Sequence, residues 1–547
     1  MTRDLTVGKP LKTIVLFTLP IFVGNVFQQL YSMIDAIIVG HTISNDALAG
    51  VGATGAISFL VIGFVQGLTA GFAVKTSQLF GAKDEDGVRR SIASSLLLCA
   101  ALSVALTAVA VLTTMPLLKL MNTHPDIIGY SYDYIVTVYW GLTATVFYNM
   151  ASSVMRAIGD SRTPLIFLIA AAVLNVAFDF LFIVAFKMGV AGAGWATTLS
   201  QALSAIGCFI YLFAKFKKCR IKREHFKNPF KFYRKHLAIG LPMALQFSIT
   251  AVGVMVQQTA LNGLGKSAVT AYTAASKIDN LAAQPLYALG SAVATYCGQN
   301  YGAGNIERIR KGVRVSMLAG VVCSLAGLAF VTLPAAPLTK LFISDITDEL
   351  LALSKQFLLY QGVFYVALAA IFVYRNALQG IGRSTLVVFA GVTELVMRII
   401  ASVVLVSSFG YLGICLSNPA AWVGADVFLI VSYVIIIGKL KKKFDIHDAA
   451  LSRDAAAIAS GDDCAAGGSL PEAAYATAIN VSDGYAAVCE ESGESVAAAT
   501  VDCDAQSSVS SDVEGITYCA AALSDGAASI DNVEPSEEAQ SSESCCK

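Results

Sequence analysis

Two aspartates stand inside long apolar stretches of this sequence, and neutral polar residues accompany each of them at helical spacing. The first, Asp35, ends a polar series that begins with Asn25, Gln28 and Ser32. The intervals of three, four and three residues place all four side chains on one face of a helix. An ionisable group in an apolar helix is costly unless it faces a cavity or a partner, so we expect this face to look into a helix bundle.

The second aspartate, Asp179, lies four residues after Asn175 and shares its helical face, while Thr197 lies in the next apolar stretch. At 1.5 Å per residue, Asp35 falls about 7 Å, and Asp179 and Thr197 about 12 Å, from the same side of their stretches. Oxygen ligands at one depth suit a proton or Na⁺, and two close carboxylates disfavour ionisation of both. The expected cation site consists of Asp35, Asn175, Asp179 and Thr197. The alternative for Asp35 is a capping or ion-pair role near a helix end.

The elements that must position these residues are membrane-spanning helices. The chain has 547 residues, 56% hydrophobic and 14% charged, against roughly 25% charged in soluble domains, and its mean hydropathy is +0.66. Its apolar runs, roughly 20 residues long, each suffice to cross a bilayer core about 30 Å thick. They do not alternate, which favours helices over a barrel. We predict twelve spans, at 12–39, 48–74, 91–116, 128–152, 163–187, 189–214, 237–261, 268–296, 312–338, 350–378, 384–408 and 411–438.

Basic residues mark one side of these spans. The connection 215–236 holds ten Lys or Arg, 439–443 holds four, and the loops on the opposite side hold none or one each. The basic side is expected to be cytoplasmic, so both termini face the cytosol, which requires an even number of spans. The apolar run 11–39 is too long for a cleavable signal peptide and is expected to remain as the first span.

The sequence also repeats itself at a shift of 221 to 223 residues. FTLPIFVGNVFQQL at 17–30 resembles IGLPMALQFSITAV at 239–252, and RAIGDSRTP at 156–164 resembles QGIGRSTLV at 379–387. SQLFGAKDEDGVRR likewise resembles GQNYGAGNIERIRK. We predict an all-α integral membrane protein of two six-helix lobes with the same orientation. The expected division is a first lobe at 1–214, a basic linker at 215–236, a second lobe at 237–443 and a tail at 444–547.

The second lobe lacks the acids of the first. At the repeat shift, Asp35 corresponds to Gln257, Asn175 to Arg398 and Asp179 to Ser402. The second lobe is therefore expected to line a polar cavity without binding the coupling cation. Glu394 and Arg398, one turn apart, form either a structural ion pair or a substrate contact. We count only Asp35, Asp179, Glu394 and Arg398 as ionisable residues deep in the spans. Candidate substrate-cavity residues are Gln28, Gln246, Gln257, Glu394 and Arg398.

The tail differs from the body in charge. It holds 20 acidic and two basic residues, which leaves 18 acidic and 36 basic residues in 1–443. Rich in Ala, Ser and Gly, the tail is expected to be disordered because it has too little apolar surface to offset the entropy of folding. No C-x-x-C pair or H-E-x-x-H motif is present, so neither a zinc or thioredoxin-type site nor a membrane metalloenzyme is expected. We expect no cofactor apart from the coupling cation, H⁺ or Na⁺.

Pro20 and Asp35, the segment GQNYGAG at 298–304, the segment RAIGDSRTP at 156–164 and the repeat together resemble the multidrug and toxic compound extrusion (MATE) family, over about residues 5–440. The resemblance implies a V-shaped pair of lobes that exports bulky, often cationic organic compounds. The family's first-lobe cation site resembles the four residues already chosen. Some members also use acids in spans 7 and 10, where this chain has Gln257 and Asn376.

The expected function is a secondary antiporter that exchanges multidrug-type compounds for H⁺ or Na⁺ in a bacterial plasma membrane. It is expected to be a monomer that binds small organic substrates and lipid but no nucleic acid. Pro20 is expected to let the first span bend, because proline removes a helix hydrogen bond. One alternative is a flippase for a lipid-linked saccharide, whose cavity should hold several cations. A membrane-embedded enzyme or receptor is a further alternative, against which the repeat and the lack of a catalytic constellation argue.

Overall fold

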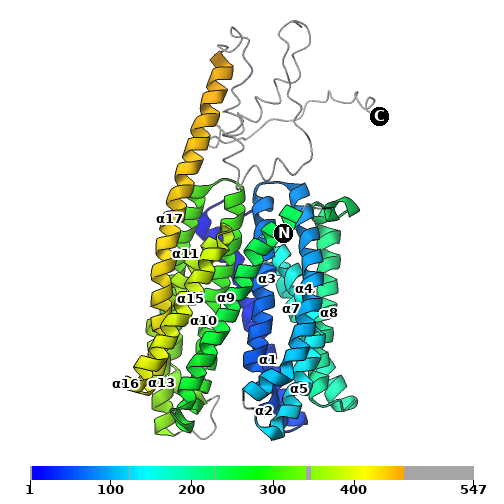
Figure 1. Cartoon of the computed structure of the whole chain (residues 1–547), viewed down its shortest axis with the longest axis vertical. Coiled ribbons are helices and arrows are strands. Elements are labelled where there is room, and N and C mark those ends of the chain that lie inside the picture. Colours follow the sequence, from blue (N-terminus) through cyan, green and yellow to red (C-terminus); the bar gives the residue numbers. More distant parts are fainter. Residues whose placement is uncertain (1–2, 122, 228–229, 341–346, 461–547) are drawn as a thin grey trace. The chain divides into compact units, whose positions relative to one another are not determined.

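The computed structural model describes residues 3–121, 123–227, 230–340 and 347–460, and every regular element in these ranges is a helix. Contacts divide the chain into Met1–Phe444 and Asp445–Lys547, and the first of these units contains the features discussed below. We call α1 to α8 the first half and α9 to α17 the second half. In Figure 1 the blue and cyan helices of the first half stand beside the green and yellow helices of the second.

The first half contains α1 (Pro10–Thr42), α2 (Asn45–Ala53), α3 (Gly55–Gly81), α4 (Glu85–Leu120), α5 (Pro125–Trp140), α6 (Leu142–Ala157), α7 (Arg162–Asp179), the π-helix η1 (Phe180–Ala185) and α8 (Val190–Lys215). Two short turns, η2 (Lys217–Cys219) and η3 (Arg223–Phe226), connect it to the second half. The second half contains α9 (Phe230–Asn262), α10 (Lys266–Gly302), α11 (Ile306–Thr332), α12 (Ala335–Lys340), α13 (Asp348–Val363), α14 (Tyr365–Gly380), α15 (Ser384–Ile400), the π-helix η4 (Ala401–Leu405), α16 (Val406–Phe409) and α17 (Tyr411–Ser460).

The helices confirm an all-α membrane protein. Within the described ranges, nine helices are long and apolar enough to cross a membrane, and α13 with α14, bent by 46°, would form a tenth span. The remaining two predicted spans correspond to the pair α5 and α6 and to α10, which do not meet the same length and composition test. The count of twelve spans therefore stays a prediction that these helices are compatible with.

Several predicted boundaries are wrong. The predicted span 48–74 is interrupted at Thr54, whose hydroxyl donates to the carbonyl of Val51 at 2.7 Å, and glycines flank this break on both sides. The predicted span 312–338 is interrupted before α12, where Pro334 lacks the N–H that a continuous helix needs.

The predicted tail begins within a helix, because α17 continues to Ser460. The first part of the predicted disordered tail is therefore helical. This segment is rich in alanine, which has the highest helix propensity. The rest of the predicted tail, 461–547, lies outside the described residues.

The two halves repeat the same local backbone features. A π-helix follows α7 at Phe180–Ala185, and another follows α15 at Ala401–Leu405. Gly159 and Gly382 both have positive φ, of +87° and +84°, directly before α7 and α15. A π-helical turn is rare and inserts an extra residue into a helix. Two such turns at matched positions indicate that the repeat extends to details of backbone geometry.

A reciprocal contact joins the halves where α3 and α10 end. The amide nitrogen of Gln78 donates to the carbonyl of Gly380 at 3.0 Å, and that of Gln299 donates to the carbonyl of Ala157 at 2.8 Å. Two further residues of the contact, at a shift of 221, are Gly81 and Gly302. A Cβ on Gly81 would collide with the backbone of Gln299, and one on Gly302 with that of Gln78. We call these four residues and their two carbonyl acceptors the clasp.

A segment before α1 crosses the clasp on one side only. Leu5 is completely buried, and its backbone N–H donates to Oε1 of Gln299 at 3.0 Å. Its carbonyl accepts from Asn300 at 3.2 Å and from Arg308 at 3.2 Å. The backbone N–H of Arg3 donates to the carbonyl of Gly159 at 3.0 Å. This segment therefore contacts both halves.

Candidate cation site and substrate pocket

The structure brings the two predicted aspartates together. Asp35 of α1 is 7% exposed and Asp179, the last residue of α7, is 0% exposed, and their carboxyl groups lie within reach of each other. Asn175, one turn before Asp179, donates from Nδ2 to Oγ1 of Thr197 in α8 at 3.3 Å. Helices α1, α7 and α8 thus place all four predicted residues in one region of the first half.

The acceptor oxygens of this group outnumber its donors. Within the described part of the chain, Asp35 Oδ1, Asn175 Oδ1 and both carboxyl oxygens of Asp179 are buried without a hydrogen-bond partner. Ionised carboxylates only accept hydrogen bonds, so two of them in contact cannot satisfy each other. Buried polar atoms are normally satisfied. A shared proton or a hard monovalent cation would supply the missing partner, and this donor set fits either one.

Two tyrosines surround the aspartates, and the sequence analysis did not identify them. The hydroxyl of Tyr134 in α5 lies within hydrogen-bonding reach of Asp35, and Tyr31 interacts with Gln201 of α8. The hydroxyl of Thr145 also donates to Oε1 of Gln201, at 2.6 Å. Tyr31 is one helical turn before Asp35, and that spacing could have revealed it. Tyr134 lies on another helix, and no spacing in the sequence relates it to Asp35.

The predicted polar face of α1 is only partly interior. Asp35 is buried, but Gln28 and Ser32 are exposed and Asn25 is half-buried. Whether the exposed side chains of Gln28 and Ser32 look into the bundle, as expected, stays a prediction, and so does the assignment of Gln28 to a substrate cavity. Pro20 lies inside the continuous helix α1, and its role as a bending point stays a prediction.

In the second half, a charged triad replaces the predicted pair of Glu394 and Arg398. Arg375 of α14 donates from Nη2 to Oε2 of Glu394 at 2.6 Å, and Arg398 donates from Nη2 to Oε1 at 2.9 Å. All three side chains are at least about nine-tenths buried. Asp426 of α17, 8% exposed, lies close enough to interact electrostatically with Arg375 and Glu394. Both oxygens of Glu394 are therefore satisfied.

The count of four ionisable residues deep in the spans is wrong. Arg375 and Asp426 belong to the triad's surroundings, and Asp279 of α10 accepts a hydrogen bond from the hydroxyl of Tyr365 at 2.8 Å. Each of the three interacts with a residue on a different helix. Helical spacing relates only residues one turn apart, so it gave no signal for them.

The two glutamines predicted to line a second-half cavity are buried at helix contacts. Gln257 is 1% exposed and donates to the carbonyl of Ile414 at 3.4 Å. Gln246 is 3% exposed and donates to the hydroxyl of Thr250 at 3.1 Å. Their assignment to a substrate cavity stays a prediction.

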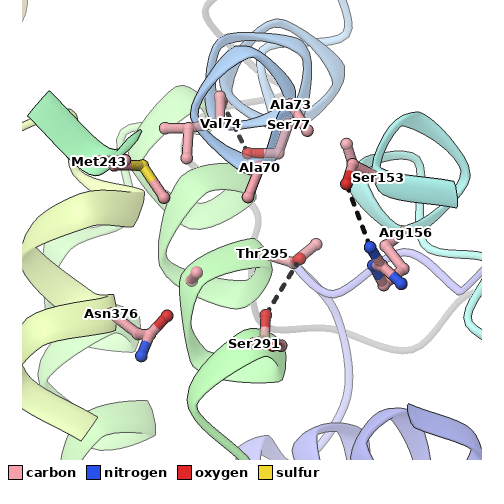
Figure 2. Close-up of a pocket in the computed structure, with 12 residues that line it drawn as sticks. Ala70, Ala73, Val74, Ser77, Ser153, Arg156, Met243, Ser291, Thr295 and Asn376 are labelled. Atoms are coloured by element: carbon pink, nitrogen blue, oxygen red, sulfur yellow. Dashed lines mark hydrogen bonds between the residues drawn. The ribbon is translucent and has the colours of Figure 1, made fainter. Parts of the chain in front are cut away.

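A pocket lies between the halves, beside the clasp (Figure 2). Helices α3 and α6 of the first half and α9, α10 and α14 of the second contribute its lining. Its polar lining residues are Ser77, Ser153, Arg156, Ser291, Thr295 and Asn376. Ala157, whose carbonyl belongs to the clasp, also lines the pocket. An occupant would therefore contact both halves next to the point where they are joined.

Comparison with known proteins adds an independent observation. The family model described as MatE matches the chain twice, over residues 20–181 and 242–404. The starts of the two matches differ by 222 residues and their ends by 223, which agrees with the sequence repeat. The first match contains Asp35, Asn175 and Asp179, and the second contains the charged triad.

Curated relatives and solved structures are also similar to this chain, each over about two thirds of its length or more. The chain is 30% identical to the "Probable multidrug resistance protein YpnP" of Bacillus subtilis, over 69% of this chain and 84% of that protein. It is 24% identical to a "FAD transporter" of Shewanella oneidensis, over 67% and 81% of the two chains. A crystal structure of MATE in complex with MaL6 aligns with a TM-score of 0.74 at 23% identity, over 81% of this chain and all of that one. A MOP superfamily transporter from Pyrococcus furiosus aligns with a TM-score of 0.73 at 24% identity, over 80% and 98%.

Proposed function

The chain belongs to the MatE family of membrane transporters, and on that premise we propose that it is a secondary antiporter that exports organic, often cationic, compounds in exchange for H⁺ or Na⁺. Membership in this family makes it a transporter rather than an enzyme. The observation that carries the proposal is the pair Asp35 and Asp179, three of whose four carboxyl oxygens are buried without a hydrogen-bond partner among the described residues. A secondary transporter needs such a group, because an ion couples to transport only where it binds differently in two conformations.

The coupling step follows from charge. When no cation is bound, two buried carboxylates in contact repel each other and lack donors, which favours separation or solvation of the pair. A bound proton or Na⁺ removes the repulsion and lets Asn175 and Thr197 close around it. Cation binding thus favours one packing of α1, α7 and α8 over another. This differential affinity biases the equilibrium between the two states of the transporter.

The protein is a multi-pass membrane protein, and we place it in a bacterial plasma membrane with both termini in the cytosol. The basic connection between the halves and the basic residues after the last span support this orientation. The clasp then joins the halves on the cytoplasmic side. We further propose a monomer, in which one chain supplies the cation site and the substrate pocket.

Transport into inverted membrane vesicles tests the proposal. A cationic dye should accumulate when a pH gradient, or a Na⁺ gradient, is imposed alone, and collapse of that gradient should stop accumulation. Vesicles that contain Asp35→Asn at equal abundance serve as the matched control. If accumulation needs ATP, or proceeds equally without either gradient, the antiport proposal is wrong.

One observation bears on the flippase alternative. The sequence places only Arg398 deep in the second half, whereas the structure adds Arg375 beside it. Both guanidinium groups, however, bond the same carboxylate, Glu394, and the triad is buried rather than open. The names of relatives, which include multidrug resistance proteins and a FAD transporter, support export of soluble organic compounds instead.

A further inference from the structure

The pocket between the halves has an electrostatic character of its own. Of its twelve lining residues, Arg156 of α6 is the one charged side chain, and no carboxylate is among them. Arg156 is half-buried, and no ion pair within the described part of the chain includes it. By contrast, Arg375 and Arg398 both bond Glu394. A positive charge held inside a transporter without a counter-ion marks a place where an anion is favoured.

Most neutral hydrogen-bond donors of the pocket already have acceptors in the protein. Ser77 donates to its own helix at the carbonyl of Val74 at 2.8 Å, and Thr295 donates to the carbonyl of Ser291 at 3.3 Å (Figure 2). The amide nitrogen of Asn376 donates to the carbonyl of Phe372 at 2.8 Å. Most neutral donors are therefore engaged with backbone.

Arg156 retains donors for a ligand. Its guanidinium carries five N–H groups, and among the described residues its one side-chain hydrogen bond runs from Nη2 to the hydroxyl of Ser153 at 3.1 Å (Figure 2). A planar guanidinium binds carboxylate, sulfonate and phosphate oxygens through two parallel hydrogen bonds. Its place in the last turn of α6 favours a positive charge through the helix dipole. The helix dipole, however, does not explain why the Arg156 side chain lines a pocket that contains no acidic residue.

We propose that this pocket is a subsite for the anionic group of an exported organic compound, with Arg156 as the residue that binds it. The proposal rests on the function proposed above and narrows the substrate class to compounds that carry a carboxylate, sulfonate or phosphate, zwitterions included. Ala157, next to Arg156, supplies its carbonyl to Gln299 of the clasp. An anion bound at Arg156 therefore lies beside the contact that must break when the halves separate.

A matched pair of dyes tests the subsite. The probes are a rhodamine with a free carboxylate and the methyl ester of the same dye, which lacks the negative charge. Binding is measured by fluorescence anisotropy on purified protein in detergent. Arg156→Gln should weaken binding of the free acid by about tenfold or more, the scale of one lost charge-assisted hydrogen bond, and change binding of the ester by less than about twofold. Arg156→Lys should retain part of the preference because it keeps the charge.

The control is Arg162→Gln, the same substitution at an exposed arginine that does not line the pocket. It should leave both affinities unchanged. Equal weakening of both dyes by Arg156→Gln, or no weakening of either, would overturn the subsite. Failure of the proposed function gives a different result: the free acid binds through Arg156, but no ion gradient drives either dye into vesicles. If an ion gradient drives export of the ester but Arg156→Gln does not weaken binding of the acid, the antiport proposal holds and the subsite proposal is wrong.

Discussion

Helices α7 and α15 occupy matched positions in the two halves, and both lead into a π-helix, yet their charged residues differ. In α7, Asp179 lies within reach of Asp35, and three of their four carboxyl oxygens are buried without a hydrogen-bond partner in the described part of the chain. In α15, Arg398 occupies the repeat position that matches Asn175. Arg398 and Arg375 both bond the carboxylate of Glu394. The first half thus holds two carboxyl groups whose buried oxygens mostly lack donors in the described part of the chain, whereas in the second half two guanidinium groups share the carboxylate of Glu394.

This difference assigns separate tasks to the halves. A site that can gain or lose a cation at moderate cost must have unsatisfied acceptors in at least one state, as Asp35 and Asp179 do. A triad with satisfied carboxylate oxygens gains nothing from a proton, because protonation of Glu394 would neutralise the carboxylate that both guanidinium groups bond. On the proposed function, the same backbone would therefore support ion coupling in the first half and fixed packing in the second.

The largest expected effect comes from removing either acid of the first half. Asp35→Asn and Asp179→Asn should each reduce gradient-driven export to the level of empty vesicles, and the double mutant should add little, because the two residues act as one unit. Gln257→Ala, at the position that matches Asp35, should leave the cation midpoint unchanged, since a neutral amide takes up no proton. Cation-dependence curves for the single variants are the measurement. A shifted midpoint in Gln257→Ala with an unchanged one in Asp179→Asn would reverse the assignment of the halves.

The next effect separates the halves by stability rather than transport. Glu394→Gln removes the carboxylate that both buried arginines, Arg375 and Arg398, bond, and should destabilise the fold by about 3–5 kcal/mol, seen as a lower Tm of the protein in detergent. Asp179→Asn, an isosteric change that also removes one buried negative charge, should not lower Tm, because it relieves repulsion. Equal loss of Tm in both variants would contradict the contrast between the triad and the acid pair.

A third experiment tests the clasp, in which the two halves make equivalent contacts. Gly81→Ala and Gly302→Ala each place a Cβ against the backbone of the opposite half. Alanine by itself favours a helix over glycine by about 1 kcal/mol, so any destabilisation reports on the clasp. Amide hydrogen exchange at 77–82 and 298–304 should rise in both variants to a similar degree. A rise in one variant only would show that the clasp is not reciprocal.

The smallest effect is expected at the surface of the first half. Lys218 Nζ lies 2.8 Å from Oε1 of Glu85, and this contact holds the pKa of Glu85 below its ordinary value. Lys218→Ala should cost less than about 1 kcal/mol, because exposed ion pairs are screened by water. Because the pKa of Glu85 is lowered in the folded protein, its ionised carboxylate stabilises the fold at pH values above the ordinary pKa of 4.5. This stabilisation is lost as the pH falls through the lowered pKa. The Tm difference between Lys218→Ala and the wild type should therefore disappear in acid, and a constant difference would refute the ion pair.

The sequence predicted the membrane class, the repeat and the acid pair because each produces a regular pattern along the chain. Apolar runs reveal spans, a fixed shift reveals the repeat, and intervals of three and four residues bring Asp35 and Asp179 to notice. Breaks within spans, as at Thr54, were missed because a run of apolar residues does not show where a helix is interrupted. So was the helical continuation to Ser460, because composition typical of disorder also has high helix propensity.

The residues that the sequence did not reveal have partners on other helices. Arg375 and Glu394 are 19 positions apart and meet only because α14 and α15 pack together. Tyr134 reaches Asp35 from α5, and Arg156 matters because five helices converge on its pocket. None of these relations has a period in the sequence. Only the three-dimensional arrangement distinguishes an arginine with a carboxylate partner from one without.

The clasp has a consequence for the conditions under which the halves stay joined. Its two reciprocal bonds run from uncharged side-chain amides to backbone carbonyls. Neither partner titrates between acid and alkali, and neither bond is weakened by dissolved ions as a charge pair is. This closure should therefore be indifferent to ionic strength, leaving the ion gradient to act through the acid pair alone.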